Sequence, residues 1–508
     1  MKKAFVLLAL LFCVLTLPAF AADAPAQPAA PTLLVPKETS SVTQHSVTIN
    51  GQTIQYTATA GNLLVDNDKG DAIGSFFYVA YTKDGADLNK RPVTFLFNGG
   101  PGSSSIWLHM GSFGPVRVVT SDAQPTPPPP YDLAQNQYSL LDKSDLVFID
   151  AIGTGFSRIV GKGTPKDFYG TDPDIASFGK FIKRYVTVNN RWNSPKFLLG
   201  ESYGTTRAAG LSDWLQQNGI ALNGVVLQSS WLNGFVDFPG PPFSLDLPYE
   251  LYLPTMAATA WYHDKLPNKP ADLPVFLQQV RDFALGDYAQ ALAQGVNLSA
   301  ANTQAIAEKL HDYTGLPVQY ILNAKLRIDP FRFEKELLRG QDRTVGRLDS
   351  RFEGIDAEAA GENPSYDPSS SAIGPAYTAA FHWYLENDLK YHSDLQYKVE
   401  NYREVGKDWD NGQRIDGQTY PLMDVEENLR AAMTENPHLK VFSANGYFDF
   451  ATPFFETEYD LDHMGLDPSL MKNISYGYYQ SGHMIYLNVP ALAKYKADLA
   501  RFYNSASE

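Results

Sequence analysis

One pentapeptide constrains the fold of this chain more than any other segment. It reads Gly200-Glu201-Ser202-Tyr203-Gly204 and lies between a short apolar run and a helical pattern. The run at 196–199 is typical of a buried strand, and the pattern at 205–216 is typical of a helix. Glycines at both ends leave room for a sharp turn with an exposed serine. The segment therefore predicts a strand–turn–helix unit that presents a nucleophile.

Two later segments supply partners for this serine. Asp449 follows an apolar run at 441–442, and His483 lies in a Gly-His-Met loop after the run at 474–478. A serine hydroxyl is a poor nucleophile until a positioned base takes its proton, so we assign His483 as that base. Asp449 would fix the imidazole tautomer and stabilise the imidazolium. The chain order Ser202, Asp449, His483 is the order found in α/β-hydrolases.

The apolar runs predict a mostly parallel sheet between helices. Alternating polar and apolar residues at 42–81 predict antiparallel strands at the start. Continuous apolar runs suit strands that are covered on both faces. They lie at 93–97, 146–149, 197–199, 225–227, 441–442 and 474–478. The expected fold class is α/β, with the α/β-hydrolase fold.

A long insertion interrupts this sheet pattern. Helical periodicity dominates between 235 and 413, for example at 273–294, 299–312 and 330–338. We interpret 235–413 as a mainly helical cap over the active-site edge, so the hydrolase core comprises 41–234 and 414–508. The second interpretation is an independent helical domain with no role at the site.

The first residues are typical of a secretory leader. A basic start, a short apolar core and Ala19-Phe20-Ala21 predict a signal peptide at 1–21, and 22–40 reads as a disordered Ala/Pro-rich spacer. No second long apolar stretch follows, so no membrane span is expected after the leader is removed. Cys13, in the leader, is the one cysteine, and the mature chain has no disulfide. We therefore expect an exported protein, most simply in a bacterial periplasm.

Charge and spacing exclude other classes of function. The chain has 41 Lys and Arg against 56 Asp and Glu, and this acidic balance argues against nucleic-acid binding. No H-E-x-x-H or paired Cys/His spacing indicates a metal, and no cofactor is expected. The other histidines lack the loop setting of His483 and read as surface or packing residues. Four carboxylates in a predicted helix are expected to be solvated: Glu456, Glu458, Asp460 and Asp462.

A glycine-rich loop follows the run at 93–97. Glycines let backbone N–H groups approach a substrate closely, and an oxyanion hole needs two such donors. We expect one donor to be the Tyr203 amide, directly after the nucleophile, and the other to come from the loop at 98–102. The loop is unconvincing as a phosphate site, because it lacks the Gly-Lys-Ser/Thr ending and Pro101 removes a donor.

Three blocks of this sequence resemble the motifs of the serine carboxypeptidases. Shorter matches at 113–115, Asp150 and 153–157 support the likeness, which covers about 91–233 and 424 to the end. The main blocks are Asn98-Gly99-Gly100-Pro101-Gly102-Ser103-Ser104, Gly200-Glu201-Ser202-Tyr203-Gly204 and Gly482-His483-Met484.

The resemblance implies roles for several residues. It assigns the triad to the same Ser202, Asp449 and His483, and the oxyanion donors to the Gly100 and Tyr203 amides. It also implies that Asn98 and Glu201 bind the free carboxylate at a peptide's C-terminus. Glu201 can do so only when protonated, because two anions repel, so activity favoured at acidic pH is expected.

The sequence departs from the family pattern at three positions. Ser103 stands where relatives commonly have a disulfide-forming Cys, and Tyr447 replaces a usual acidic residue two places before Asp449. Ser112 stands where relatives carry the acid that pairs with the residue matching Glu201. The carboxylate-binding geometry therefore depends on what replaces that acid.

The combined hypothesis is an exported serine carboxypeptidase that acts on peptides or proteins through an acyl-enzyme. An esterase, acyltransferase or aminopeptidase-like hydrolase with the same triad is the alternative within this chemistry. A catalytically silent binding protein on the same scaffold is the alternative from another class. An Arg- and Asp-rich stretch at 339–351 has two interpretations, a surface of ion pairs, which is favoured, or a reach from the cap into the site.

Overall fold

The computed structural model describes residues 33–236, 245–415 and 417–507. The expected leader at 1–21 lies outside these residues, as does the spacer up to residue 32. Residues from Leu33 onward form one compact unit. The described end of the spacer, 33–39, is exposed and has no regular structure, and the first strand begins at Ser40.

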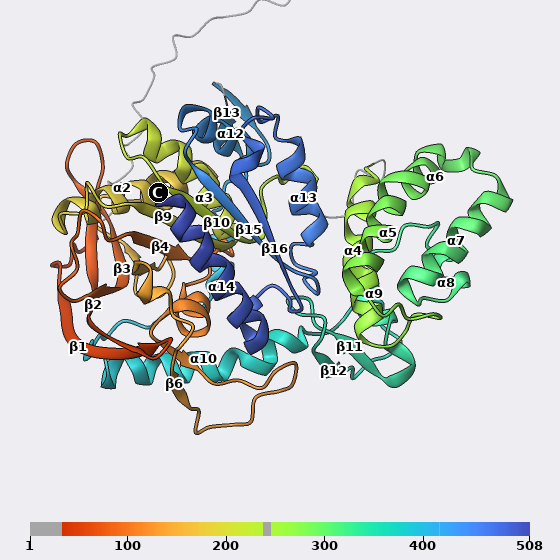
Figure 1. The fold of residues 1–508 in the computed structure, drawn as a ribbon, viewed down its shortest axis with the longest axis horizontal. Coiled ribbons are helices and arrows are strands. Elements are labelled where there is room, and N and C mark those ends of the chain that lie inside the picture. Colours follow the sequence, from red (N-terminus) through yellow and green to blue (C-terminus); the bar gives the residue numbers. More distant parts are fainter. Residues whose placement is uncertain (1–32, 237–244, 416, 508) are drawn as a thin grey trace, which may run out of the picture. The chain divides into compact units, whose positions relative to one another are not determined.

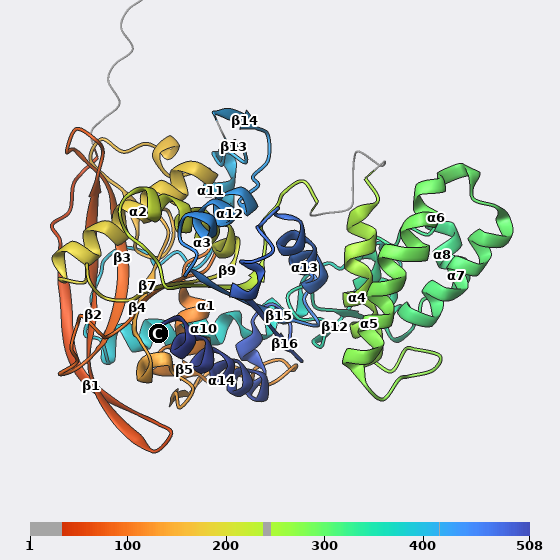
Figure 2. The ribbon, with the colours of Figure 1, turned by 45° about the horizontal axis from the view of Figure 1, so that its top comes forward.

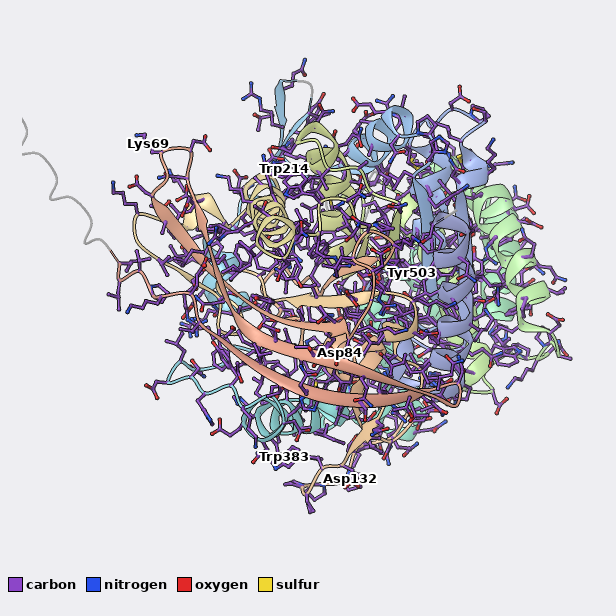
Figure 3. All side chains as sticks on the ribbon, turned by 60° about the vertical axis from the view of Figure 1, so that its left-hand side comes forward. Lys69, Asp84, Asp132, Trp214, Trp383 and Tyr503 are labelled. Atoms are coloured by element: carbon purple, nitrogen blue, oxygen red, sulfur yellow. The ribbon has the colours of Figure 1, made fainter. Side chains whose placement is uncertain are left out.

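The N-terminal strands form an antiparallel meander. They are β1 (Ser40–Ile49), β2 (Gln52–Asp66) and β3 (Ala72–Lys83). Asn50 and Gly51 connect β1 to β2 with φ of 49° and 76°, the positive values that a tight hairpin turn needs. Figure 3 turns these strands toward the reader. The predicted antiparallel strands at 42–81 are therefore confirmed.

The meander continues into a parallel sheet. β3 pairs antiparallel with β7, and from β7 onward every pair of neighbouring strands along the sheet is parallel. The order is β1-β2-β3-β7-β4-β9-β10-β15-β16, with β8 (Arg158–Ile159) also on β3. The six parallel strands coincide with the six continuous apolar runs. They are β4 (Val93–Phe97), β7 (Asp145–Ile149), β9 (Lys196–Ser202), β10 (Gly224–Ser230), β15 (Lys440–Gly446) and β16 (Ile474–Tyr479).

Helices cover both faces of the sheet, as Figures 1 and 2 show. Phe95 and Phe97 of β4 point to one buried cluster, and Leu96 points to another. The first cluster includes residues of α2 (Thr171–Val188), α3 (Tyr203–Gln217) and α12 (Glu426–Glu435). The second includes α14 (Val489–Ala506). Burial on both faces explains why these strands are apolar throughout.

The insertion divides into two parts that pack differently. Most of its helices share a third buried cluster with Phe448, Phe450 and Phe454 of the core. These helices are α4 (Leu247–Tyr262), α5 (Leu273–Phe283), α6 (Ala289–Gln294), α7 (Ala300–Thr314), α8 (Val318–Asn323) and α9 (Pro330–Glu336). The predicted helix at 273–294 is interrupted, because Gly286 has non-helical φ and ψ of −104° and −105°.

The second part of the insertion packs on the core. α10 (Pro368–Asn387) contributes Ile373, Tyr377 and Phe381 to the same cluster as α14, while Trp383 on its outer side is exposed (Figure 3). Short elements complete the insertion and the loops around it. They are α1 (Ile106–Leu108), a π-helical turn (His109–Phe113), β5 (Val116–Val118), β6 (Leu133–Gln135), β11 (Arg343–Val345), β12 (Glu353–Ile355), α11 (Tyr402–Lys407), β13 (Gln413–Ile415) and β14 (Gln418–Tyr420).

One expectation about the helix after Asp449 is wrong. α13 (Phe454–His463) forms as predicted, but Glu456 and Asp460 are buried rather than solvated. They are four residues apart and share one side of α13. The helix packs against α4, β10 and β15. Glu458 is also shielded and pairs with Arg281 at 2.6 Å, which leaves Asp462 as the exposed member of the four.

No helix among residues 33–236, 245–415 and 417–507 is long and apolar enough to cross a membrane.

Candidate active site

The turn between β9 and α3 has the geometry expected for a nucleophile. Ser202 adopts φ 62° and ψ −135°, a region that residues with a side chain rarely occupy. A Cβ on Gly200 would lie 2.0 Å from the Gly204 carbonyl oxygen. A Cβ on Gly204 would lie 2.6 Å from the Phe97 carbonyl oxygen. Both glycines are therefore required for the strand and the helix to meet at this angle.

Asp449 and His483 form a buried pair. His483 Nδ1 lies 2.8 Å from Asp449 Oδ2. Asp449 also accepts hydrogen bonds from the Ala451 and Thr452 amides at 2.8 and 3.1 Å, and from the Thr452 hydroxyl at 2.8 Å. Burial disfavours a charged imidazole, but the charge and hydrogen bond of Asp449 outweigh it and raise the pKa of His483. Asp449 thus stabilises the imidazolium form.

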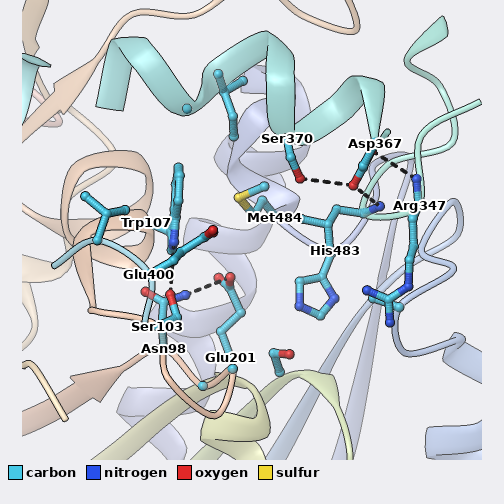
Figure 4. A pocket seen from close by; sticks show the side chains of 18 of the residues that line it. Asn98, Ser103, Trp107, Glu201, Arg347, Asp367, Ser370, Glu400, His483 and Met484 are labelled. Carbon is cyan, nitrogen blue, oxygen red and sulfur yellow. Dashed lines mark hydrogen bonds between the residues drawn. The ribbon is translucent and has the colours of Figure 1, made fainter. Parts of the chain in front are cut away.

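Ser202 and His483 line one cavity of about 750 Å³ (Figure 4). Within the described part of the chain, the Ser202 hydroxyl makes no hydrogen bond to the imidazole. In hydrolases this bond is often long without substrate and tightens in the reactive complex. The three side chains of a triad are therefore close together, but the serine hydroxyl is not hydrogen-bonded to the histidine.

The glycine loop after β4 lies directly against the elbow. A Cβ on Gly99 would lie 2.3 Å from the Gly204 nitrogen and 2.5 Å from the Tyr203 nitrogen. Gly100 has φ of 112° and lines the cavity. Only glycine allows this approach, which brings the loop to the N-terminus of α3, where backbone amides favour negative charge.

A buried ion pair holds the loop in place. Arg207 of α3 donates to the Asn98 carbonyl oxygen at 2.7 Å and pairs with Asp174 of α2 at 2.7 Å. The Arg207 guanidinium also lies 4.1 Å from the centre of the Phe178 ring. Nothing in the local sequence around 98–102 indicates this support, because its members come from two distant helices.

Glu201 is buried beside the nucleophile and accepts three hydrogen bonds. Asn98 Nδ2 and Gln228 Nε2 each donate to its carboxyl at 2.8 Å, and the Tyr486 hydroxyl donates at 3.2 Å. Burial disfavours the ionised form and raises the pKa of Glu201 to about 7, although the His483 charge and these hydrogen bonds act in the opposite direction. The carboxyl is therefore protonated at acidic pH.

The Ser112 side chain is used within its own turn, and a residue of β10 contacts Glu201. The buried Ser112 hydroxyl donates to the Leu108 carbonyl oxygen at 2.5 Å, within its own helical turn. Gln228, at the end of β10, contacts Glu201 instead and also donates to the His483 carbonyl oxygen at 3.2 Å. Sequence reasoning missed Gln228, although a polar residue at the carboxyl end of a buried parallel strand is a usable signal for a site.

The insertion supplies one wall of the cavity. Ile373, Gly374 and Thr378 of α10 line it, as do Val399, Glu400 and Tyr402. The Tyr402 ring covers the glycine loop, since a Cβ on Gly100 would lie 3.0 Å from its Cε1 atom. The chemical groups come from the sheet domain, whereas much of the shape of the cavity comes from the insertion.

The Arg-rich stretch at 339–351 contributes both to ion pairs and to the cavity. Arg351 pairs with Asp349 at 2.6 Å and with Asp122 at 2.9 Å, as expected for an ion-paired surface. Arg347, in contrast, lines the cavity. One member of the stretch therefore reaches the site from the insertion, as the second interpretation expected.

Ser103 and Tyr447, the other two departures from the expected pattern, both have local roles. The Ser103 hydroxyl accepts a hydrogen bond from Trp107 Nε1 at 3.1 Å at the cavity edge. Tyr447 is buried and stacks on Tyr478, with ring centres 5.8 Å apart. In the described ranges, no group of His, Cys, Asp and Glu side chains is arranged to hold a metal ion.

Part of this chain is similar to known serine carboxypeptidases. Residues 50–240 match the family described as serine carboxypeptidase. The pheromone-processing carboxypeptidase KEX1 of Cryptococcus gattii is 27% identical over 169 residues, which are 32% of this chain and 24% of that protein. KEX1 of Saccharomyces cerevisiae is 34% identical over 136 residues, 25% of this chain and 17% of that protein. The chain thus spans a quarter or less of the length of these two relatives.

A solved structure covers much more of the chain. The crystal structure of Kex1(delta)p, a prohormone-processing carboxypeptidase from Saccharomyces cerevisiae, has a TM-score of 0.55 and 16% sequence identity. The match covers 88% of this chain and 91% of that chain. The two proteins share a fold, and the mostly parallel sheet with its serine elbow is that of the α/β-hydrolases. The predicted fold class is confirmed.

Proposed function

We propose that this chain is a serine carboxypeptidase, which removes residues from the C-terminus of peptides or proteins; the match at residues 50–240 and the shared fold support this proposal. Ser202 Oγ attacks the scissile carbonyl carbon while His483 takes the hydroxyl proton. His483 then gives that proton to the leaving amine, and an acyl-enzyme remains on Ser202. Water hydrolyses this ester by the same proton route.

The other residues prepare this reaction. Asp449 orients His483 and stabilises its charged form. The Gly100 and Tyr203 amides receive the oxyanion of the tetrahedral intermediate, and each such donor lowers the barrier by on the order of 3 kcal/mol. The strained backbone at Ser202 supports this role, because it places the hydroxyl at the tip of a turn rather than along a strand.

The observation that carries the carboxypeptidase assignment is the buried carboxyl of Glu201 beside the nucleophile. With a pKa raised to about 7, Glu201 is neutral at acidic pH and can donate a hydrogen bond to a carboxylate. Asn98 Nδ2, which lies 2.8 Å from Glu201, supplies a second donor. We assign these two groups to the free C-terminus of the substrate, and we expect activity to be favoured at acidic pH.

The proposal extends to the place where the protein works. The leader-like start at 1–21 supports export of the protein. Because no cysteine follows Cys13, the exported chain carries no disulfide. A bacterial periplasm fits both features. Fractionation of cells that produce the full chain, with sequencing of the N-terminus of the released protein, tests this assignment.

The experiment on function is mass spectrometry of a mixed peptide pool after incubation with the full chain at acidic and at mildly alkaline pH. Peptides shortened from the C-terminus, more at acidic pH, support the proposal, and a Ser202→Ala variant should leave the pool unchanged. Peptides shortened from the N-terminus would favour an aminopeptidase. Cleaved esters with intact peptides would favour an esterase.

Labelling with a fluorophosphonate separates catalysis from silent binding. The wild-type protein should be labelled and Ser202→Ala should not. Equal labelling of both, or none of the folded wild type, contradicts a serine hydrolase of any kind.

A further inference from the structure

Glu400 brings a carboxyl group from the insertion to the cavity that holds the nucleophile. Figure 4 shows its side chain on the same side of this cavity as Asn98 and Glu201. Among the described residues, Arg347 is the one Lys or Arg that lines the cavity, and Figure 4 shows it beyond His483. The end of the cavity next to Asn98 therefore has an acidic side chain in its lining and no basic one.

Backbone hydrogen bonds to the glycine loop fix the position of Glu400. The Ser104 amide donates to the Val399 carbonyl oxygen at 2.9 Å. The Asn401 amide donates to the Gly102 carbonyl oxygen at 2.7 Å. Glu400 lies between these two bonds, so its place relative to the expected oxyanion loop is set on both sides. Such support is what a group that must be positioned for binding requires.

The Glu400 carboxyl takes part in no ion pair or hydrogen bond with the described residues. The nearest basic residue along the chain, Lys398, pairs with Glu404 at 2.5 Å instead. Burial disfavours the ionised form and raises the pKa of the Glu400 carboxyl. A cation bound beside this carboxyl would stabilise its ionised form, so the group is suited to a positively charged ligand.

The wall beside Glu400 is aromatic and apolar. Trp107, Ile373 and Val399 line the same cavity. Trp107 Nε1 donates to the Ser103 hydroxyl at 3.1 Å, and Ser103 forms an antiparallel bridge with Glu400, so the indole ring is held near the carboxyl. Lys and Arg pack their methylene stems on apolar surface, and the face of Trp attracts cations. A carboxylate beside such a wall matches a long basic side chain.

We propose that Glu400 selects substrates with Lys or Arg at the C-terminus, by pairing with the charged end of that side chain. This inference rests on the proposed function, in which Glu201 and Asn98 receive the carboxylate of the same residue. Asn98 and Glu400 lie on one side of the cavity, so the side chain of that residue extends toward Glu400. Lys would bind through its ammonium group, and Arg through two parallel hydrogen bonds.

The test compares a basic with a neutral leaving group in two kinds of substrate, assayed as kcat/KM at mildly acidic pH, where Glu201 keeps its proton. The first is a pair of N-blocked peptides that end in Lys or in norleucine, which has the same straight stem without the ammonium group. The second is a pair of N-blocked peptidyl esters of aminopentanol or hexanol, whose leaving groups have the reach of Lys but no carboxylate. The wild-type protein should prefer the basic member by about tenfold or more in both pairs, as expected for a charged hydrogen bond.

Three variants assign this preference to one side chain. In Glu400→Gln the ratio of kcat/KM for Lys over norleucine should fall to near one, and in Glu400→Lys it should fall below one, because like charges repel. Asp394→Asn is the matched control, because Asp394 lies a few residues before Glu400 and is exposed but does not line the cavity. It should keep the wild-type ratio. The ratio is the readout because a changed His483 affects both members of a pair alike.

The outcomes separate this inference from the proposed function. A preference for the basic member that persists in Glu400→Gln, or a wild-type ratio near one in both pairs, overturns the role of Glu400. If the esters show a preference that Glu400→Gln removes but no peptide is cleaved, the carboxypeptidase proposal fails and the role of Glu400 stands. If peptides are shortened from the C-terminus without a preference for Lys, only the role of Glu400 fails. A preference confined to the peptides supports the role of Glu400 and shows that it depends on the bound carboxylate.

Discussion

Replacing Glu201 with Gln should separate recognition of a free C-terminus from the chemistry at Ser202. Gln has nearly the same shape as a protonated Glu, keeps a donor and stays neutral at every pH. The wild-type carboxyl loses its proton as the pH rises through about 7, its pKa being raised by burial. The Glu201→Gln variant should therefore keep its affinity for free C-termini at alkaline pH, where the wild-type protein loses it.

The expected loss of affinity follows from the repulsion between the ionised Glu201 carboxylate and the substrate's C-terminal carboxylate. At about 4 Å and an effective dielectric constant of about 20, they repel by about 4 kcal/mol, or roughly a thousandfold in binding. For a peptide with a free C-terminus, kcat/KM of the wild type should fall about tenfold per pH unit above the Glu201 pKa, until about three decades are lost.

The same group also predicts a change in stability. The folded protein raises the pKa of Glu201 from 4.5 to about 7, so it binds the proton more tightly than the unfolded chain. The stabilisation is fully present below 4.5 and is lost as the pH rises to about 7. It amounts to about 3 kcal/mol in the free energy of unfolding, at about 1.4 kcal/mol per pH unit. The Glu201→Gln variant should lack this loss in urea unfolding curves.

The assay is kcat/KM against pH for a blocked peptide with a free C-terminus and for its C-terminal amide. Because His483 acts on both substrates, the ratio of their kcat/KM values isolates the effect of Glu201 on binding of the free C-terminus. Glu400→Gln shows how much of the fall comes from the other carboxyl in the cavity, because Glu400 also lines it and burial raises the pKa of its carboxyl. A wild-type ratio that does not change with pH, or an alkaline fall that persists in Glu201→Gln, refutes the assignment of Glu201 to the substrate carboxylate.

Three further changes have defined outcomes. Asp449→Asn should lower kcat by about 10⁴-fold in steady-state assays, because the wrong tautomer of the catalytic histidine is favoured, while the melting temperature shows whether the fold persists. Gly99→Ala should lower kcat by at least about a hundredfold, because its Cβ would lie 2.3 Å from the Gly204 nitrogen and displace the oxyanion loop. Gly406→Ala is the control and should leave kcat unchanged, because a Cβ there would have open space around it. Gln228→Glu places a second carboxyl against Glu201, so the two share a proton and the alkaline fall in the free-acid to amide ratio should move up by at least about one pH unit.

Local patterns predicted the framework of this protein well. The continuous apolar runs became the parallel strands, because strands buried on both faces have no exposed side on which to place polar residues. The burial of Glu456 and Asp460 was predicted wrongly, because periodicity identifies a helix but not every residue on its packed side. The roles of the triad and oxyanion residues remain proposals that the geometry supports.

The sequence by itself determined the elbow at Ser202, because a buried strand, two glycines and a helix are all contiguous in the chain. Only the tertiary structure decided what surrounds Glu201 and His483. Gln228 and Tyr486 reach Glu201 from separate segments, and Arg347 enters the cavity from the insertion. These contacts depend on strand register and on how the insertion packs, and a linear pattern carries neither.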